Sequence, residues 1–71
     1  MSMMQAKMKI VKIEKGAESH ALHFHVTGTA EENTFSNDNP SAGLSITVSN
    51  TDLIGKFKVG QKYRLDFTLV D

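Results

Sequence analysis

Hydrophobic and polar residues alternate with a period of two along four segments of the chain. The alternation is clearest at Leu22, Phe24 and Val26, which are separated by His23 and His25. Successive side chains of an extended strand point to opposite faces, so this pattern predicts strands with one buried face each. The predicted strands cover residues 6–14, 20–27, 44–49 and 62–70.

The first predicted strand changes the phase of its alternation part-way along. Met8 and Ile10 share one face, whereas Val11 and Ile13 share the other. A β-bulge, which inserts one extra residue into a strand, would produce this shift. A strand buried on both faces would produce it as well, and the sequence leaves both interpretations open.

Polar segments between the strands predict turns and loops. Residues 15–18 contain Gly16 and suit a hairpin turn, and residues 59–61 contain Gly60 and suit another. Residues 36–43 include an Asn-Asp-Asn-Pro run, whose side chains compete with regular structure, and they predict a surface loop.

Two segments are expected to form one helical turn each. Residues 29–32 fit a capping box, in which a threonine and a glutamate three residues later satisfy exposed main-chain amides. Residues 50–55 fit a second turn, which Ser49 or Asn50 would cap and Gly55 would end.

These elements predict an all-β protein, a small antiparallel barrel or sandwich of about four to five strands with one or two short helical turns. Residues 1–71 form a single domain, of which residues 1–5 are expected to be disordered. A flat four-stranded sheet would leave one face exposed, so the sheet must curl, form two layers or be covered by another subunit. The predicted core comprises Ile10, Leu22, Phe24, Val26, Leu44, Ile46, Val48, Tyr63, Leu65, Phe67 and Leu69.

Composition narrows the class of protein. A chain of 71 residues without cysteine has no disulfide, and small domains of this kind often gain stability by association, so a homo-oligomer is expected. The formal net charge of zero argues against a general nucleic-acid binder, though not against a local basic patch. No apolar run is long enough to span a bilayer, and the start of the chain does not resemble a secretory signal. We therefore expect a cytoplasmic protein with no membrane partner.

No constellation of residues predicts catalysis, so we expect a protein that is not an enzyme and needs no cofactor. His23 and His25 share the outer face of one strand, but a metal site would need a third ligand such as Glu14 or Asp66, and none is expected. Adjacent Glu31 and Glu32 point apart in a helical turn, which favours capping over acid–base chemistry.

Basic residues gather near both ends of the chain. If the first and last strands are neighbours, they form one basic strip that could contact phosphates, either of a nucleic acid or of a nucleotide. Lysines also protect edge strands from pairing with other chains, and this simpler explanation is favoured. The residues concerned are Lys7, Lys9, Lys12, Lys15, Lys56, Lys58, Lys62 and Arg64.

Phe35 lies in a polar segment, between Thr34 and Ser36. A large aromatic side chain is costly to leave in water, so we expect it to pack under the turn at 50–55 or against a neighbouring subunit. We expect residues 29–43 to border the functional surface, because loops commonly carry binding residues. The candidate ligand- or partner-binding residues are Phe35, Glu31, Asn33, Lys56, Lys58 and Arg64.

Two segments together resemble a family of short, mostly uncharacterised phage-encoded β proteins. The first runs from Gly28 to Leu44 and contains Glu31-Glu32-Asn33, an aromatic residue, Pro40-Ser41 and Gly43. The second runs from Phe57 to Thr68 and combines a Gly turn, a Tyr and an Asp-Phe-Thr run. The chain departs from the family pattern at Val59, where a proline is expected, and in its histidine-rich strand.

The resemblance implies a non-catalytic phage protein that acts by binding, as a host-defence antagonist or another modifier of a host process, in the cytoplasm of the host cell. It would sequester a nucleotide-type signalling molecule or block a host protein. The alternatives are a nucleic-acid-binding small β-barrel module, for which the basic strip is the relevant feature, and a virion accessory or structural protein.

Overall fold

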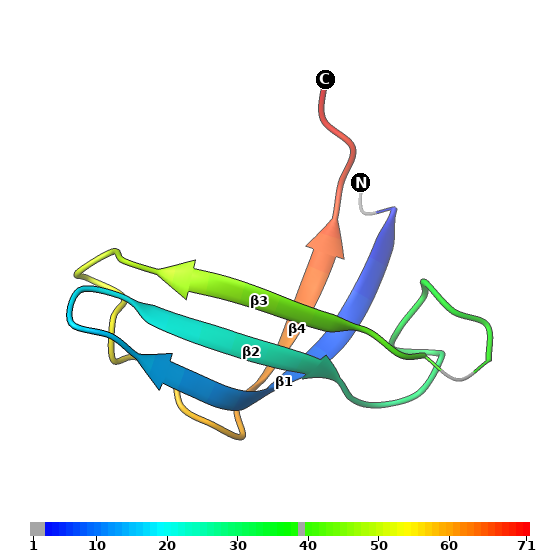
Figure 1. The fold of residues 1–71 in the computed structure, drawn as a ribbon. Helices are drawn as coiled ribbons and strands as arrows, with labels where there is room; N and C mark the ends of the chain where they lie inside the picture. Colours follow the sequence, from blue (N-terminus) through cyan, green and yellow to red (C-terminus); the bar gives the residue numbers. More distant parts are fainter. Residues whose placement is uncertain (1–2, 39) are drawn as a thin grey trace.

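A computed structural model describes residues 3–38 and 40–71, which form one antiparallel sheet of four strands (Figure 1). The spatial order of the strands is β3-β2-β1-β4, and every neighbouring pair is antiparallel. The strands are β1 (Met4–Lys15), β2 (His20–Val26), β3 (Gly43–Val48) and β4 (Lys62–Phe67). The prediction of a small, all-β antiparallel fold is confirmed.

β1 is long enough to serve two parts of the sheet. Its first half, Met4 to Lys9, pairs with β4, and its second half, Met8 to Lys15, pairs with β2. Figure 1 shows the first half of β1 and β4 turning away from the direction of β2 and β3, while the second half of β1 runs beside β2, so that the sheet curls into a half-barrel. The curl lets one sheet enclose a core, because the apolar face of a sheet must be buried.

A bulge at Val11 explains the phase shift in β1. The register with β2 slips between Ile10 and Lys12, so Ile10 faces Phe24 and Ile13 faces Leu22. Directly opposed residues of an antiparallel pair point to the same face. The extra residue therefore brings Ile13 to the same face as Ile10, and the bulge interpretation is confirmed.

The core lies inside the curl, between the strands at its two ends. Phe24 of β2 meets Tyr63 of β4 edge to face, with ring centroids 6.0 Å apart, and Phe57 packs on the same tyrosine at 5.9 Å. Such contacts join β2 to β4, which are not neighbours in the sheet. The buried apolar side chains of the described residues are Ala6, Met8, Ile10, Leu22 and Phe24.

The predicted core is correct at its centre and wrong at its edges. Ile10, Leu22 and Phe24 are buried, and four of the eight other predicted core residues pack partly buried around them: Leu44, Val48, Tyr63 and Leu65. Ile46 and Phe67 are 41% and 43% exposed, and Leu69 is 76% exposed. The half-barrel is open where these residues lie, so alternation places Ile46 and Phe67 on the core face without covering them.

The strand ends differ from the prediction at both termini. β1 begins at Met4, so Met4 and Gln5, which we expected to be disordered, pair with Phe67 and Asp66 of β4. Residues 1 and 2 of that expectation lie outside the described residues. The last strand ends at Phe67 rather than continuing to residue 70.

The predicted turns are present as single turns, and no helix occurs within residues 3–38 or 40–71. At residues 50–55, Asn50 accepts main-chain bonds from Leu53 and Ile54 through its carbonyl, and its side chain accepts one from Asp52 N at 2.8 Å. Gly55 has a φ of 86°, as expected for a residue that ends such a turn. The described part of the chain thus offers no helix that could cross a lipid bilayer.

Candidate anion-binding site

The pairing of β1 with β4 places four cationic side chains on the outer face of the sheet. Lys7 lies directly opposite Arg64, and Lys9 lies directly opposite Lys62. Neighbouring residues Met8 and Tyr63 point to the core, so the four cations share the other face. We call Lys7, Lys9, Lys62 and Arg64 the basic quartet.

Like charges directly opposite one another destabilise a strand pair. Two acidic residues offset part of this repulsion: Glu32 Oε2 lies 2.8 Å from Lys7 Nζ, and Asp66 Oδ2 lies 3.1 Å from Arg64 Nε. Lys9 forms no ion pair among the described residues. The quartet therefore keeps a local excess of positive charge in a chain whose net charge is zero.

A loop after β2 forms one wall of the site by following the free side of β1. Thr27 N donates to Lys7 O at 2.8 Å, and Thr34 N donates to Gln5 O at 2.9 Å. In return, Gln5 N donates to the hydroxyl of Thr34 at 2.8 Å. These bonds replace the strand pairing that β2 no longer supplies beyond Val26, and they place Glu31 and Glu32 beside the basic quartet.

Asn33 holds this loop in place from inside. Its side chain is fully buried, its Oδ1 accepts a bond from Lys7 N at 2.7 Å, and its Nδ2 donates to the carbonyls of Thr27 and Thr29 at 3.0 and 2.8 Å. A buried amide needs partners of this kind, because an unsatisfied polar group in the interior is costly. The amide of Asn33 is used structurally, below the surface that a ligand would touch.

Glu32 links the loop turn to the quartet. Its carboxylate accepts a bond from Thr29 N at 3.4 Å, which is one half of the predicted capping box. The hydrogen bond from Lys7, followed by that from Thr29 and by the charges of Lys7 and Lys62, holds the pKa of Glu32 below its usual value. Gly28, at a φ of 93°, lies so close that a Cβ there would sit 2.7 Å from Glu32 Oε1.

An open cavity of about 250 Å³ lies between the loop and the two strands. Three cations and two carboxylates border it, together with one amide side chain. Its lining residues are Gln5, Lys7, Glu31, Glu32, Lys62, Tyr63 and Arg64. The cavity is open to solvent and has charged side chains among its lining residues, which suits a charged ligand or part of one.

No match to this chain is found among protein-family models, curated proteins or solved structures. The interpretation of the site therefore depends on the chemistry of its own residues.

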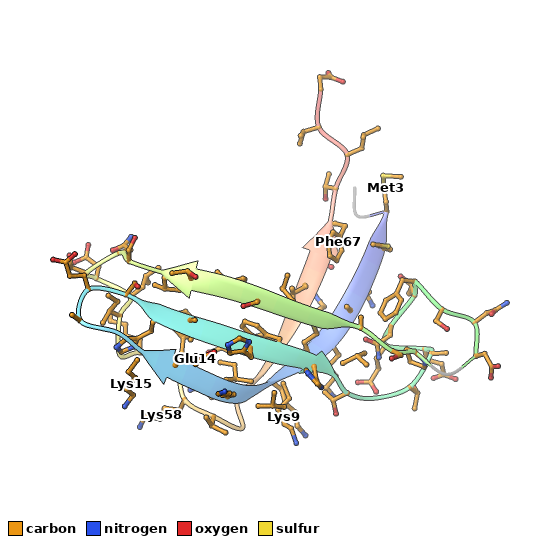
Figure 2. The ribbon with its side chains drawn as sticks, in the orientation of Figure 1. Met3, Lys9, Glu14, Lys15, Lys58 and Phe67 are labelled. Atoms are coloured by element: carbon orange, nitrogen blue, oxygen red, sulfur yellow. The ribbon has the colours of Figure 1, made fainter. Side chains whose placement is uncertain are left out.

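The structure brings together only some of the candidate binding residues. Glu31 and Arg64 line the cavity, and Asn33 lies buried beneath the loop beside it. Lys56 and Lys58 lie on the segment that leads into β4 and do not line the cavity. Figure 2 shows Lys58 projecting from that segment, separate from Lys9 of the basic quartet.

Phe35 lies on the other face of the sheet from the quartet. It is half-buried against the core and lines an apolar cavity of about 200 Å³ with Met4, Leu44 and Phe67, among others. The turn at 50–55 borders a different hollow with Ala17 and Glu18 of the β1–β2 hairpin loop. The expectation that Phe35 packs under that turn is wrong, because the loop carries it to the opposite end of the sheet.

The histidine face forms a side-chain hydrogen bond between His23 and Glu14. His23 Nε2 lies 2.6 Å from Glu14 Oε1, and Lys12 is the residue directly opposite His23. Within residues 3–38 and 40–71, no group of three or more metal-ligating side chains comes together.

Gln5, Lys7 and Lys62 line the cavity although they were not among the candidate binding residues. Lys7 and Lys62 belonged only to the basic strip expected if the first and last strands are neighbours, a condition that the structure meets. The sequence contained one signal: Lys7 and Lys9, like Lys62 and Arg64, are two residues apart and therefore share a strand face. Combining the pairs required knowing that β1 and β4 are neighbours, which only the structure supplies.

Proposed function

We propose that this chain is a non-catalytic binding protein whose basic quartet binds a phosphate-bearing ligand of the nucleotide type. The observation that supports the proposal is the register of β1 and β4, which sets Lys7 against Arg64 and Lys9 against Lys62. This arrangement costs stability in the free protein, and a bound phosphate would relieve it by charge-assisted hydrogen bonds.

The cavity beside the quartet supports a small ligand. It offers Lys7, Lys62 and Arg64 for phosphate oxygens, while Glu31 and Gln5 lie where donor groups of a sugar or base would meet them. At about 250 Å³, it holds part of a nucleotide rather than enclosing it.

The proposal is tested by titrating the protein with inorganic phosphate, mononucleotides and cyclic dinucleotides, with affinity measured by calorimetry. Lys7→Ala should weaken the binding of the best ligand by roughly 10- to 100-fold, the usual value of a hydrogen bond to a charged group. Lys15→Ala is the matched control, because it removes the same charge from the far end of the same strand. Equal effects of the two substitutions, or no binding by any of these ligands, would contradict the proposal.

A nucleic acid is the second candidate ligand. The observation in its favour is that basic side chains continue along β1 beyond the quartet to Lys12, with His25 opposite Lys9 and His23 opposite Lys12 on β2. Binding of an oligonucleotide should fall steeply with salt in proportion to the phosphates neutralised. Stacking platforms, which single-strand binders use, are not offered by Phe24 or Tyr63, since both rings pack in the core.

The wider role in this proposal follows the family resemblance. A phage-type protein without catalytic residues, working as a homo-oligomer in the host cytoplasm, would counter a host process by sequestering such a ligand or by blocking a host protein. Expression of the wild-type chain or of its Lys7→Ala variant in a bacterial host tests this role. The wild-type chain should abolish the host's protection against phage, whereas the Lys7→Ala variant should leave that protection intact. If both proteins have the same effect on the host, the basic quartet is not needed for this role.

A further inference from the structure

β4 is the outermost strand on one side of the sheet. Its inner side pairs with β1, and no strand of the described residues pairs with its outer side. The carbonyls of Gln61 and Phe67 accept bonds from β1 and from Met3, so the odd-numbered positions direct their main-chain groups inward. Alternation directs those of Lys62 and Arg64 outward, where an added strand would meet them.

We propose that β4 pairs antiparallel with β4 of a second copy of this chain, about a two-fold axis at Leu65. This register places Arg64 opposite Asp66 of the second copy, and Asp66 opposite Arg64 of the second copy. The interface is self-complementary, as a two-fold interface must be. Two sheets of four strands join into one continuous sheet.

Charge selects this register from the alternatives. Antiparallel pairing sets residues of the same parity opposite each other, so the axis passes through a single residue of the strand. An axis at Arg64 or at Asp66 sets each of these residues against its own copy, and an axis at Tyr63 sets Lys62 against Arg64. An axis at Arg64 also sets Lys62 against Asp66, but Arg64 then faces its own copy. Like charges directly opposite are destabilising, and the axis at Leu65 opposes unlike charges without opposing any like pair.

The side chains on both faces of β4 suit the same register. Arg64 Nε already lies 3.1 Å from Asp66 Oδ2 of its own strand. A guanidinium has further N–H groups, which can donate across the axis without breaking that bond. On the core face, Tyr63 would lie opposite Phe67 of the second copy, covering a ring that is 43% exposed in the single chain.

The outer strand at the other side of the sheet lacks these features. β3 contains no charged residue, so no register of β3 with itself is selected by charge. An unselected edge permits several pairings, whereas the charges of β4 specify one. The argument therefore assigns the second copy to β4.

The pairing also completes the ligand site, an extension that rests on the proposed function. β4 contributes Lys62 and Arg64 to the basic quartet, so the axis brings two quartets onto one continuous outer face. A ligand with two phosphates could then contact both copies, which explains how a cavity of about 250 Å³ in one chain would serve a larger molecule.

The interface is tested by light scattering and sedimentation on ligand-free protein over a concentration series. The wild type should be a dimer. Arg64→Asp and Asp66→Arg should each raise the dissociation constant of the homodimer by at least ~100-fold, because each sets like charges across the axis. An equimolar mixture of the two variants should form a heterodimer, since Asp at one position then meets Arg at the other in both contacts.

The mixture separates the interface from the ion pair within the strand. Each variant has lost its internal Arg64–Asp66 pair, so only pairing between copies can explain recovery in the mixture. A monomeric wild type, a dimer that survives both substitutions, or a mixture that stays monomeric would each overturn the proposal. Because no ligand is present, these outcomes are independent of the calorimetric test on Lys7.

Discussion

Replacing Asn33 by alanine should release the loop that forms one wall of the candidate site. The substitution removes three hydrogen bonds of 2.7 to 3.0 Å from a fully buried position. The main-chain N–H of Lys7 loses its acceptor, which costs about 1–3 kcal/mol, and the two carbonyls each lose about 1 kcal/mol of net bonding. Water entering the loop recovers part of this, so we expect a loss of ~3 kcal/mol.

A loss of that size is large for this domain. Stability of 0.05–0.15 kcal/mol per residue gives roughly 4–11 kcal/mol for a chain of this length. Urea unfolding followed by circular dichroism should therefore show a much lower midpoint for Asn33→Ala, with the slope of the transition unchanged. Asn37→Ala is the control, because Asn37 is exposed in the same loop and should change stability by less than ~0.5 kcal/mol.

An aspartate at the same position distinguishes the role of the amide oxygen as an acceptor from the role of the amide nitrogen as a donor. Asn33→Asp keeps an acceptor for Lys7 N, but it can donate to only one of the carbonyls of Thr27 and Thr29, and only when it is protonated. The folded state then favours the protonated acid, which raises its pKa, so this variant should gain stability relative to wild type as the pH falls. Equal urea midpoints for Asn33→Ala and Asn37→Ala would refute the reasoning. An Asn33→Asp variant whose stability relative to wild type does not change with pH would refute it as well.

Three further predictions follow from the loop and the core face. Phe35→Ala should lower stability by ~2 kcal/mol in urea unfolding, since the ring is half-buried, and an unchanged midpoint would show that it does not pack on the core. Gly28→Ala should cost ~1 kcal/mol or more, because the position has a φ of 93° and the new Cβ meets the Glu32 carboxylate; a neutral or stabilised variant would contradict this. The pKa of Glu32 is lowered by folding, so its pairing stabilises the protein above the usual value of 4.5 and is lost as the pH falls further. An NMR titration of Lys7→Ala should move that pKa back up, and no movement would show that Lys7 is not its main cause.

Local pattern was enough to predict the strands, because alternation depends only on neighbouring residues. The bulge was visible in the same way, since Ile10 and Val11 break the period within one strand. Strand order was beyond that reasoning, because it depends on contacts between Met4 and Phe67, which are far apart in sequence. The basic quartet could not be predicted from local pattern either, since it exists only where β1 and β4 are neighbours.

Asn33 was visible in the sequence but its role was not. We placed it among the binding residues because it belongs to the loop at 29–43, which we expected to border the functional surface. Its burial follows from the loop running beside β1, where main-chain groups of Lys7 need partners that no strand provides. The exposure of Phe67 has the converse origin, because alternation predicts a face and not whether anything covers that face.

The division of β1 between two partners has a consequence for the order of folding. Its pairing with β2 joins residues that are close in sequence, whereas its pairing with β4 joins Met4 to Phe67. Local contacts lose less chain entropy on closing than distant ones, so we expect the β1–β2 hairpin and β3 to form in the folding transition state and β4 to dock afterwards. Leu22→Ala should then slow refolding, while Leu65→Ala should mainly speed unfolding, as measured by stopped-flow kinetics. The opposite pattern would mean that the two ends of the chain meet first.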